Sequence, residues 1–451
     1  MSPSASLVSL HLAGEEQIPC PDDLTLDTLP GKFTLTRTDA ALTAYGGLVA
    51  WSAFLKHLGL IERLAQRCPV SRSSPNAAPV REVLHSFALC ALVEGKRFCH
   101  VRWLTDDPAL ATVMNMDRVR GEDALPRLAK GMSVEPMREW MQQPQTELYA
   151  ALPERFIADW DSTVNTRYGH QEDAALGYNP HKRGRKSHHP LICVAARTRL
   201  CLHLEWRPGD TVSATDWQPA MEKLWSHPTI RERLWLNRGD TGFGQEAVMA
   251  WHEQAGETRP QYLFKLRLTS NVRRAIAKVP WPLWEGVPTL GCQQIAETTV
   301  KLHGWSRERR VVGKAEITGD KDNPRFIVTD LKGSPKALYE RRYCARGEAE
   351  NRIKEAQLDL FGRRASCHRF WANQLRLLLA ALAYTLMINL RRHALAGTEL
   401  AQACTATIRT RLLKIAAAIV RNTRRVRVML ASAHPLRGLY AHAAHTLASS
   451  P

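Results

Sequence analysis

Two acidic residues in a short apolar segment are the first candidates for chemistry. Asp159 and Asp161 lie in the sequence Phe-Ile-Ala-Asp-Trp-Asp-Ser-Thr, which resembles a β-strand. On a strand the two carboxylates point to one face, where they repel each other unless a cation lies between them. The alternative is one metal ligand plus one hydrogen-bonded carboxylate. Asp161 is the better ligand candidate, because it lies at the strand end, where sites in α/β sheets gather.

A second candidate, Asp240, lies among glycines in the sequence Arg238-Gly-Asp-Thr-Gly-Phe-Gly. A predicted strand runs directly into this segment, and its glycines permit tight turns and the close approach of a ligand. The alternative is a plain β-turn in which Asp serves only its turn propensity. A second strand-end Asp on an adjacent strand favours the functional interpretation.

The third candidate, Glu350, lies in a stretch with helical spacing. Five side chains recur at intervals of three or four residues and therefore share one face of a predicted helix. They are Tyr343, Arg346, Glu350, Lys354 and Gln357. Most charged helix faces are simply solvated. Tyr and Arg beside a Glu also suit DNA binding next to a metal ligand, since Arg grips phosphate oxygens in a fork and Tyr donates a hydrogen bond.

Three carboxylates without any other ligand cluster suit hard divalent cations that prefer oxygen, Mg²⁺ or Mn²⁺. Two such ions about 4 Å apart, held by Asp161, Asp240 and Glu350, could activate a water or a 3′-hydroxyl and stabilise the leaving oxygen. The residues thus predict phosphodiester chemistry without a covalent enzyme intermediate.

A turn-rich basic loop, residues 177–190, begins shortly after Asp161. A solvated basic loop is the alternative interpretation, but its position next to the first Asp favours contacts with DNA phosphates. Its histidines lack Cys or acidic partners at ligand spacing, so a metal site there is disfavoured. The fixed cations of the loop are Lys182, Arg183, Arg185 and Lys186.

The elements that must position these residues can be read from hydrophobic spacing. From 155 to 268 the order is βββαβαβ, which predicts an α/β sheet with both parallel and antiparallel pairs. Helical spacing dominates before it, and two long helices are predicted near 342–360 and 367–393. The predicted regions are a mostly helical N-terminal DNA-binding or assembly region (1–145), the first part of the α/β core (150–270), a β-rich insertion (271–338), the second part of the core with the Glu350 helix (339–395) and a basic helical tail (396–451).

Composition points to a polyanionic partner. The 451 residues include 62 Lys or Arg against 44 Asp or Glu, a formal net charge of +18, and nucleic acid is the usual partner of such a chain. A membrane partner is not expected, because the most apolar run, 377–388, is shorter than the roughly 20 residues that span a bilayer. Ten scattered cysteines without a C-x-x-C pair predict reduced thiols in a cytoplasmic protein and no structural zinc.

A second basic segment lies at the end of the sequence. From residue 400 onward there are eight Lys or Arg residues and no Asp or Glu. This segment is a second candidate DNA surface. Its candidate contact residues are Arg421, Arg424, Arg425 and Arg427.

Together these motifs resemble the DDE transposases of bacterial insertion sequences, in the group called the IS-thirteen-eighty family, near the Tn5-like transposases. The resemblance covers most of 155–395 in order. It is carried by Asp161-Ser-Thr-Val, Gly177-Tyr-Asn-Pro-His-Lys-Arg-Gly-Arg-Lys-Ser, Arg238-Gly-Asp-Thr-Gly-Phe, Tyr262-Leu-Phe-Lys-Leu-Arg, Tyr343-x-x-Arg-x-x-x-Glu-Asn and Ser366-Cys-His-Arg-Phe-Trp-Ala-Asn-Gln-Leu-Arg.

The resemblance implies an RNase H-like catalytic domain whose β-rich insertion precedes the Glu-bearing helix. It implies Mg²⁺-dependent cleavage and strand transfer at terminal inverted repeats, with Asp161, Asp240 and Glu350 as the acidic triad. The expected partner is double-stranded DNA, element ends and target, bound by a homodimer in the bacterial cytoplasm at the nucleoid. Related motifs often have Lys seven residues after the Glu, where this chain has Gln357. The alternatives are a catalytically decayed DNA-binding protein and a nuclease without strand transfer.

Overall fold

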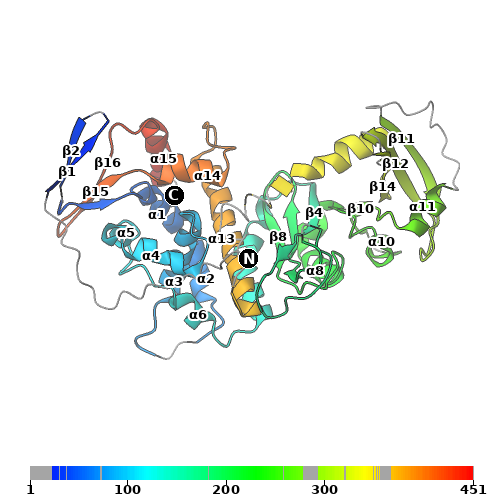
Figure 1. Ribbon diagram of the computed structural model, residues 1–451, viewed down its shortest axis with the longest axis horizontal. Helices are drawn as coiled ribbons and strands as arrows, with labels where there is room; N and C mark the ends of the chain where they lie inside the picture. The colour runs from blue at the N-terminus through cyan, green and yellow to red at the C-terminus, as the bar shows by residue number, and fades with distance from the viewer. Residues whose placement is uncertain are drawn as a thin grey trace, which may run out of the picture.

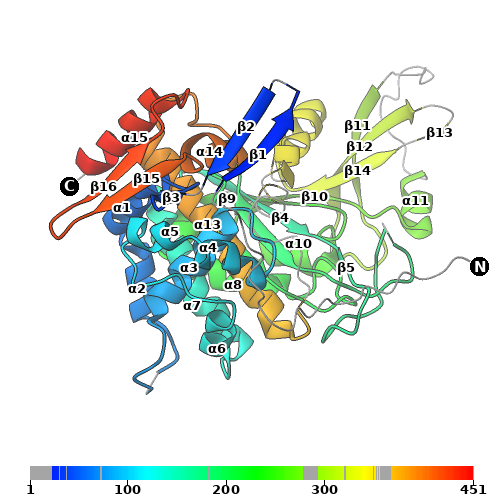
Figure 2. The ribbon, with the colours of Figure 1, turned by 60° about the vertical axis from the view of Figure 1, so that its left-hand side comes forward.

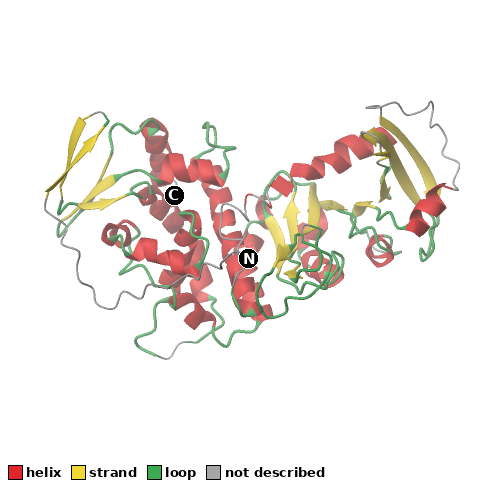
Figure 3. Ribbon diagram, in the orientation of Figure 1, coloured by secondary structure: helices red, strands yellow, loops and turns green. Residues whose placement is uncertain are grey.

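The computed structural model describes residues 23–449, apart from 30, 37, 72–73, 181, 257, 278–292, 319–320, 323, 349, 352, 354 and 356–366. Most helices lie on one side and the large sheet on the other, with the long helix α13 (Phe370–Ala394) between them (Figures 1 and 3). The fold is therefore mixed α/β, as the spacing predicts.

One large sheet forms the other half of the molecule. In the described part of the chain it has nine strands in the order β11-β12-β14-β10-β9-β4-β7-β8, with β13 paired to β12. The middle strands β10, β9 and β4 are parallel, and their neighbours are antiparallel. The strands are β4 (Phe156–Ser162), β7 (Leu191–Ala195), β8 (Cys201–Glu205), β9 (Leu234–Gly239), β10 (Gln261–Lys265), β11 (Gln293–Val300), β12 (Arg309–Thr318), β13 (Lys321–Asp322) and β14 (Arg325–Thr329).

Helices cover both faces of this sheet because alternate strand residues are apolar on each side. On one face Trp160 and Phe264 pack against the helices that carry Trp217 and Met249. The opposite face is covered by α13 and by the segment that begins at Ala337. The remaining elements around the sheet are η2 (Tyr149–Ala151), β5 (Asn165–Thr166), β6 (Ser187–His188), α8 (Trp217–Trp225), α9 (Pro228–Arg233), α10 (Glu246–His252), α11 (Ser270–Ala277), η3 (Ala337–Tyr343) and η4 (Cys344–Arg346).

In the stretch predicted as β-rich at 271–338, helix α11 ends at Ala277, and the described residues from Gln293 to Thr329 include strands β11 to β14, which are continuous with the core. Strand β14 pairs with β10, so β12 and β11 extend the same sheet outward (Figure 2). The alternating sequence predicts strands without revealing their pairing partner, because pairing depends on residues far along the chain.

The N-terminal helices and the C-terminal segment form one unit, which corrects their prediction as two separate regions. A single apolar core joins residues from Leu48 to Met141 with residues from Leu375 to Leu447. The short strand β3 pairs with β15, which ties the two segments together. The unit comprises β3 (Ala41–Thr43), α1 (Leu48–Leu58), α2 (Leu60–Gln66), α3 (Val80–Leu92), η1 (Phe98–Val101), α4 (Arg102–Thr105), α5 (Pro108–Val113), α6 (Ala124–Ala129), α7 (Val134–Glu147), α13, α14 (Thr405–Ile408), η5 (Arg409–Leu413), β15 (Ala417–Arg421), β16 (Val426–Leu430) and α15 (Arg437–Ser449).

Strands also appear at both ends of the chain, within a tail predicted as helical and an N-terminal region predicted as mostly helical. The tail at 396–451 contains the β15–β16 hairpin between its helices, and the N-terminal region contains a two-stranded sheet of β1 (Asp23–Thr28) and β2 (Gly31–Thr36). The run Ile-Val-Arg-Asn-Thr-Arg-Arg-Val-Arg-Val has the β-branched residues that favour strands. Its arginines mask the alternation that would identify a hairpin in the sequence.

Helix α13 is the one described helix that is long and apolar enough to cross a membrane. Its mean hydropathy is 1.2 over the most apolar window, but 94% of that window is buried within the protein. One part packs on the sheet through Leu377 and Ala381, and the rest lies in the helical core. It is therefore a shared core helix, consistent with the predicted buried helix at 377–388.

Candidate active site

The first two candidate carboxylates follow adjacent parallel strands. In the pairing of β4 with β9, Trp160 lies opposite Gly239, so Asp161 and Asp240 are the next residues on each strand. The turn after β9 is held by the Asp240 carboxylate, which accepts a hydrogen bond from the Gly242 N–H at 3.0 Å. The two acids thus meet at the carboxyl edge of the sheet, as predicted. Asp240 also stabilises the turn through its side chain, which was the alternative interpretation of this residue.

A glycine is required within this turn by the space around it. A Cβ on Gly242 would lie 2.1 Å from the Cβ of Ser213, a separation that packed atoms do not tolerate. The turn can therefore pass close to the loop that carries Ser213 only because Gly242 has no side chain. The glycines around Asp240 thus serve close backbone packing.

Glu350 is brought to the same edge by the segment that covers the sheet face. The Arg346 guanidinium bridges two of the candidates, donating to Asp161 Oδ1 at 3.0 Å and to Glu350 Oε1 at 2.9 Å. Arg346 is buried, whereas the Asp161 and Glu350 side chains are 20% and 47% exposed. The two carboxylates therefore share one buried cation and remain accessible from solvent.

The electrostatics of Asp161 reflect this crowding of acids. Burial raises its pKa to about 6; the Arg346 guanidinium opposes that rise, and the charges of Asp240 and Glu350 add to it. Burial by itself would lower the pKa of Arg346, but the attraction of Asp161 and Asp240 holds it above its usual value. The three predicted acids are thus electrostatically coupled.

Asp159, the neighbour that could be confused with Asp161, has a structural role. Its two oxygens accept hydrogen bonds from Arg238 Nε and Nη2 at 2.6 and 2.7 Å, and both side chains are buried. Arg238 Nη1 also donates to the carbonyl of Arg342. This pair joins β4, β9 and the segment that leads to Glu350, so Asp159 is the hydrogen-bonded carboxylate of the two.

The segment carrying Glu350 is not the uniform α-helix that the spacing predicts. It winds as a π-helix over Ala337–Tyr343 and as a 3₁₀ turn over Cys344–Arg346 before continuing as helix. Tyr343 is half-buried, with its ring centroid 5.8 Å from that of Tyr339. Burial raises the pKa of Tyr343 to about 12. Of the five predicted face residues, Lys354 and Gln357 lie outside the described residues.

A second buried contact holds the far end of this segment. The Glu355 carboxylate accepts hydrogen bonds from Arg391 at 2.7 Å and from the Thr405 N–H at 2.7 Å. Arg238 and Glu355 therefore fix the segment on either side of Arg346 and Glu350. Neither was predicted, because an ion pair between distant segments leaves no spacing signal in the sequence.

Lys265 is a further charged residue at the site that sequence reasoning missed. In the parallel pairing of β10 with β9, Phe264 lies opposite Gly239, so Lys265 comes next to Asp240. Burial lowers the pKa of Lys265, helped by Arg325, whereas Asp240 and Glu350 oppose that change. The sequence signal that could have identified Lys265 is its position at a strand end in the segment Tyr262-Leu-Phe-Lys.

Comparison with known proteins decides the class of this chain. A family model described as the transposase DDE domain, group 1, matches residues 32–451. The chain belongs to this family. It is accordingly a DDE transposase of the class that carries out phosphoryl transfer in DNA transposition. None of the curated proteins compared matches it. A solved piggyBac transposase synaptic complex with hairpin DNA is 10% identical, with a TM-score of 0.44 over 90% of this chain and 82% of that chain.

DDE transposases generally use divalent metals, and the donor chemistry of this site fits such ions. Three carboxylates offer only oxygen, the preference of Mg²⁺ and Mn²⁺. In the part of the chain that the structure describes, no three acidic, His or Cys side chains already converge as a metal site. Instead, Arg346 supplies the cation between Asp161 and Glu350. A divalent ion would therefore compete with Arg346 for these two oxygens.

The predicted basic loop lies beside this edge. Its far end approaches the first acid, because the Thr163 N–H donates to the Pro190 carbonyl at 3.3 Å. The four predicted cations are all exposed, and His188 and His189 are buried with hydrogen-bond partners within the protein. Burial lowers the pKa of His188 to about 4. His181 lies outside the described residues, so it is not placed. The cations are Lys182, Arg183, Arg185 and Lys186.

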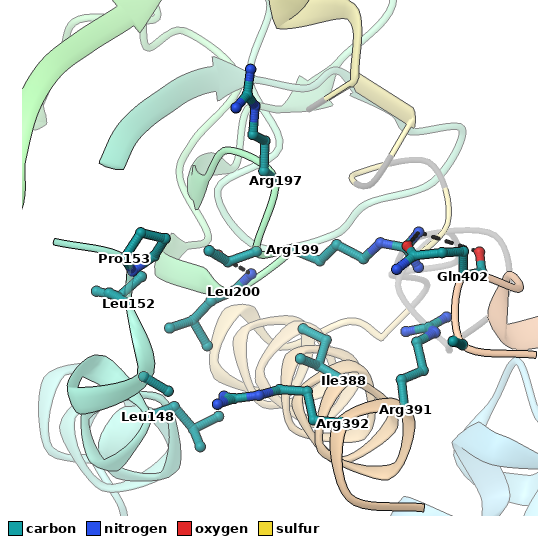
Figure 4. Close-up of a pocket in the computed structure, with 13 residues that line it drawn as sticks. Leu148, Leu152, Pro153, Arg197, Arg199, Leu200, Ile388, Arg391, Arg392 and Gln402 are labelled. Atoms are coloured by element: carbon teal, nitrogen blue, oxygen red, sulfur yellow. Dashed lines mark hydrogen bonds between the residues drawn. The ribbon is translucent and has the colours of Figure 1, made fainter. Parts of the chain in front are cut away.

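A pocket of about 250 Å³ lies elsewhere, where η2, the β7–β8 turn and α13 meet (Figure 4). It is lined by four arginines, but two of them are used in structural contacts. Arg199 donates to Gln402, and Arg391 binds Glu355. The side chain of Arg197 points away from Arg199 and Arg391 (Figure 4). No acidic residue is among those lining it, so the pocket belongs to the junction of the two halves and not to the candidate active site.

Replacing Lys265 by Met is expected to slow DNA cleavage by roughly 10- to 100-fold, because a fixed cation next to the acids stabilises charge that develops on the phosphate. Met keeps the length of the buried stem. The measurement is the single-turnover cleavage rate on saturating duplex, with Lys301→Met as the control at an exposed position. An unchanged rate in the Lys265 variant would leave Lys265 with a packing role only.

Proposed function

We propose that this protein is the transposase of a bacterial insertion sequence of the IS-thirteen-eighty family. On this proposal it cleaves DNA at terminal inverted repeats and joins the ends to target DNA through an RNase H-like domain. The observation that supports it most is the meeting of Asp161, Asp240 and Glu350 around Arg346 at the carboxyl edge of parallel strands. Acids at strand ends are where an α/β sheet binds its substrate.

The proposed roles of the residues follow from their positions. Two Mg²⁺ or Mn²⁺ ions on Asp161, Asp240 and Glu350 would supply the activation of a water or 3′-hydroxyl and the stabilisation of the leaving oxygen. Arg346, which now pairs with two of these acids, would bind a DNA phosphate through its guanidinium fork. Tyr343, with its pKa raised to about 12, stays protonated at neutral pH and can donate a hydrogen bond to phosphate.

The proposed partner is duplex DNA, both element ends and target. The exposed basic loop ends at Pro190, which contacts Thr163 two residues after Asp161, and its cations are suited to bind the DNA backbone near the acids. Lys354 stays a predicted DNA contact. Because two ends must be paired before transfer, we propose a homodimer on DNA, acting at the nucleoid in the cytoplasm.

The test uses duplexes made from the DNA that flanks this gene. The purified protein is expected to nick the junction of repeat and flank in Mg²⁺ or Mn²⁺, and to lose all activity in EDTA, because the carboxylates alone do not activate the attacking oxygen. Sequencing gels report the nick, and joining to a supercoiled plasmid reports transfer.

Each outcome of this assay separates the candidates. Binding of the repeat duplex without nicking in either metal would favour a decayed DNA-binding protein. Nicking without joining to plasmid would favour a nuclease that lacks strand transfer. Nicking that persists in EDTA would contradict the metal-dependent mechanism.

A further inference from the structure

The hairpin of β15 and β16 has a base that packs into the protein and a tip that is exposed to solvent. At the base, Ala417 and Ile419 are buried in the helical core, and β3 pairs only with Ala417 to Ile419. Beyond that point every residue from Val420 to Arg427 is exposed. Figure 2 shows this hairpin projecting on the far side of the helical unit from β11 and β14.

The turn at the tip is ordered by its own hydrogen bonds. The Asn422 N–H donates to the Arg425 carbonyl at 3.0 Å, and the Asn422 side-chain oxygen accepts from the N–H groups of Arg424 and Arg425 at 3.1 and 2.8 Å. Asn in this role is typical of tight turns. The tip is therefore presented in one conformation, which reduces the entropy cost of binding a partner.

Four arginines are concentrated in the exposed part of this hairpin. Among the described residues none of their guanidinium groups has an acidic partner, whereas buried arginines such as Arg391 and Arg409 pair with Glu. Like charges held this close repel each other, so an anionic partner would relieve the repulsion. The four, named here the tip arginines, are Arg421, Arg424, Arg425 and Arg427.

The strand pairing places the tip arginines on more than one side of the ribbon. Arg421 lies opposite Val426, and Arg427 lies opposite Val420 on the next rung, so these two arginines point to opposite faces. Arg424 and Arg425 lie at the turn between them. A ribbon that lay flat on a charged surface would need cations on one face only. Cations on both faces and at the end suit a ribbon with anionic walls on either side.

We propose that the β15–β16 hairpin inserts into the major groove of duplex DNA, with the tip arginines contacting the phosphates and base edges that line it. The major groove admits a two-stranded β-ribbon, and Arg binds guanine edges in it with its fork. Because the hairpin lies away from the catalytic edge, it binds a part of the element end other than the scissile junction. The choice of DNA as partner rests on the proposed function; the site itself rests on geometry and charge.

The test compares two variants that lose four positive charges each. The tip variant combines Arg421→Ala, Arg424→Ala, Arg425→Ala and Arg427→Ala. The control variant combines Lys301→Ala, Arg307→Ala, Lys332→Ala and Lys336→Ala, all exposed positions outside the helical unit. Fluorescence anisotropy with flanking-repeat duplex and with unrelated duplex, over a range of KCl concentrations, gives affinity and salt dependence.

The tip variant is expected to bind the repeat duplex roughly 100-fold more weakly than wild type, and to lower the slope of log affinity against log salt by about 3 to 4 if all four contacts reach phosphate. Guanine N7 positions that wild type protects from methylation should lose protection in the tip variant, and in the control variant they should not. The control variant should lose much less affinity.

Several results would overturn the hairpin proposal. One is an unchanged affinity and slope in the tip variant; another is equal losses in both variants, which would indicate net charge alone. A tip variant that binds DNA normally but no longer binds phosphatidylserine vesicles would assign the hairpin to a membrane surface. If wild type binds DNA and never nicks it, the proposed function fails, and the binding comparison still decides the role of the hairpin.

Discussion

Asp161→Asn, Asp240→Asn and Glu350→Gln are each expected to reduce metal-dependent cleavage at least about 10³-fold, because on the proposed function each change would remove a charged ligand of the two metal ions. Affinity for DNA should stay within roughly 3-fold of wild type, since these changes remove negative charge and no phosphate contact. Single-turnover cleavage and anisotropy, measured on the same duplex, separate the two effects.

A matched control and a double variant sharpen this prediction. Asp106→Asn removes an exposed carboxylate from the helical unit and should cleave normally. Combining Asp161→Asn with Glu350→Gln should cost less than about 10-fold beyond either single change, because residues that act as one unit lose their effects together. Wild-type cleavage by one variant would remove that residue from the site, and wild-type cleavage by all three would end the assignment.

The second large effect is expected on stability, at the buried pair of Asp159 and Arg238. Arg238→Ala or Asp159→Ala should lower the free energy of unfolding by about 3–5 kcal/mol, because each leaves a charge buried without its partner. Guanidinium denaturation followed by tryptophan fluorescence measures this change. Trp160, next to Asp159, is itself buried and reports on this region.

The double replacement Asp159→Leu with Arg238→Met should recover most of the lost stability, since apolar side chains of similar volume need no partner in the core. The exposed pair of Arg127 and Asp123 is the control, where Arg127→Ala should cost less than about 1 kcal/mol. If a single change at Asp159 or Arg238 costs no more than this surface control, the pair is not what joins the three segments.

Much of the catalytic half could be predicted from local patterns. The strands that end near Asp161 and Asp240 are each short, apolar and bounded by turns, and the structure confirms their order and mixed pairing. The place of Asp161 at the strand end favoured it over Asp159 as the ligand candidate. The partner that holds Asp159, Arg238, could not be predicted, because it is adjacent only after β4 and β9 have paired. Lys265 was missed for the same reason.

The helical half was predicted less well because its contacts are the most distant in sequence. Spacing identifies α13 as an apolar helix but cannot show that it completes a core built from residues before 142. The helix that carries Glu350 was predicted, whereas its π and 3₁₀ turns were not, because a change of winding leaves the polar spacing nearly unchanged. The metal ligation of the three acids stays a prediction.

The place of α13 in two cores has a consequence for how the chain is made. During synthesis the helices before residue 142 leave the ribosome long before α13 does, with the whole catalytic sheet translated in between. Their apolar surface stays uncovered for that interval and is exposed to aggregation and proteolysis. A chain cut short before Phe370 would never cover it. We expect such fragments to be degraded, so that only complete chains persist to compete for DNA.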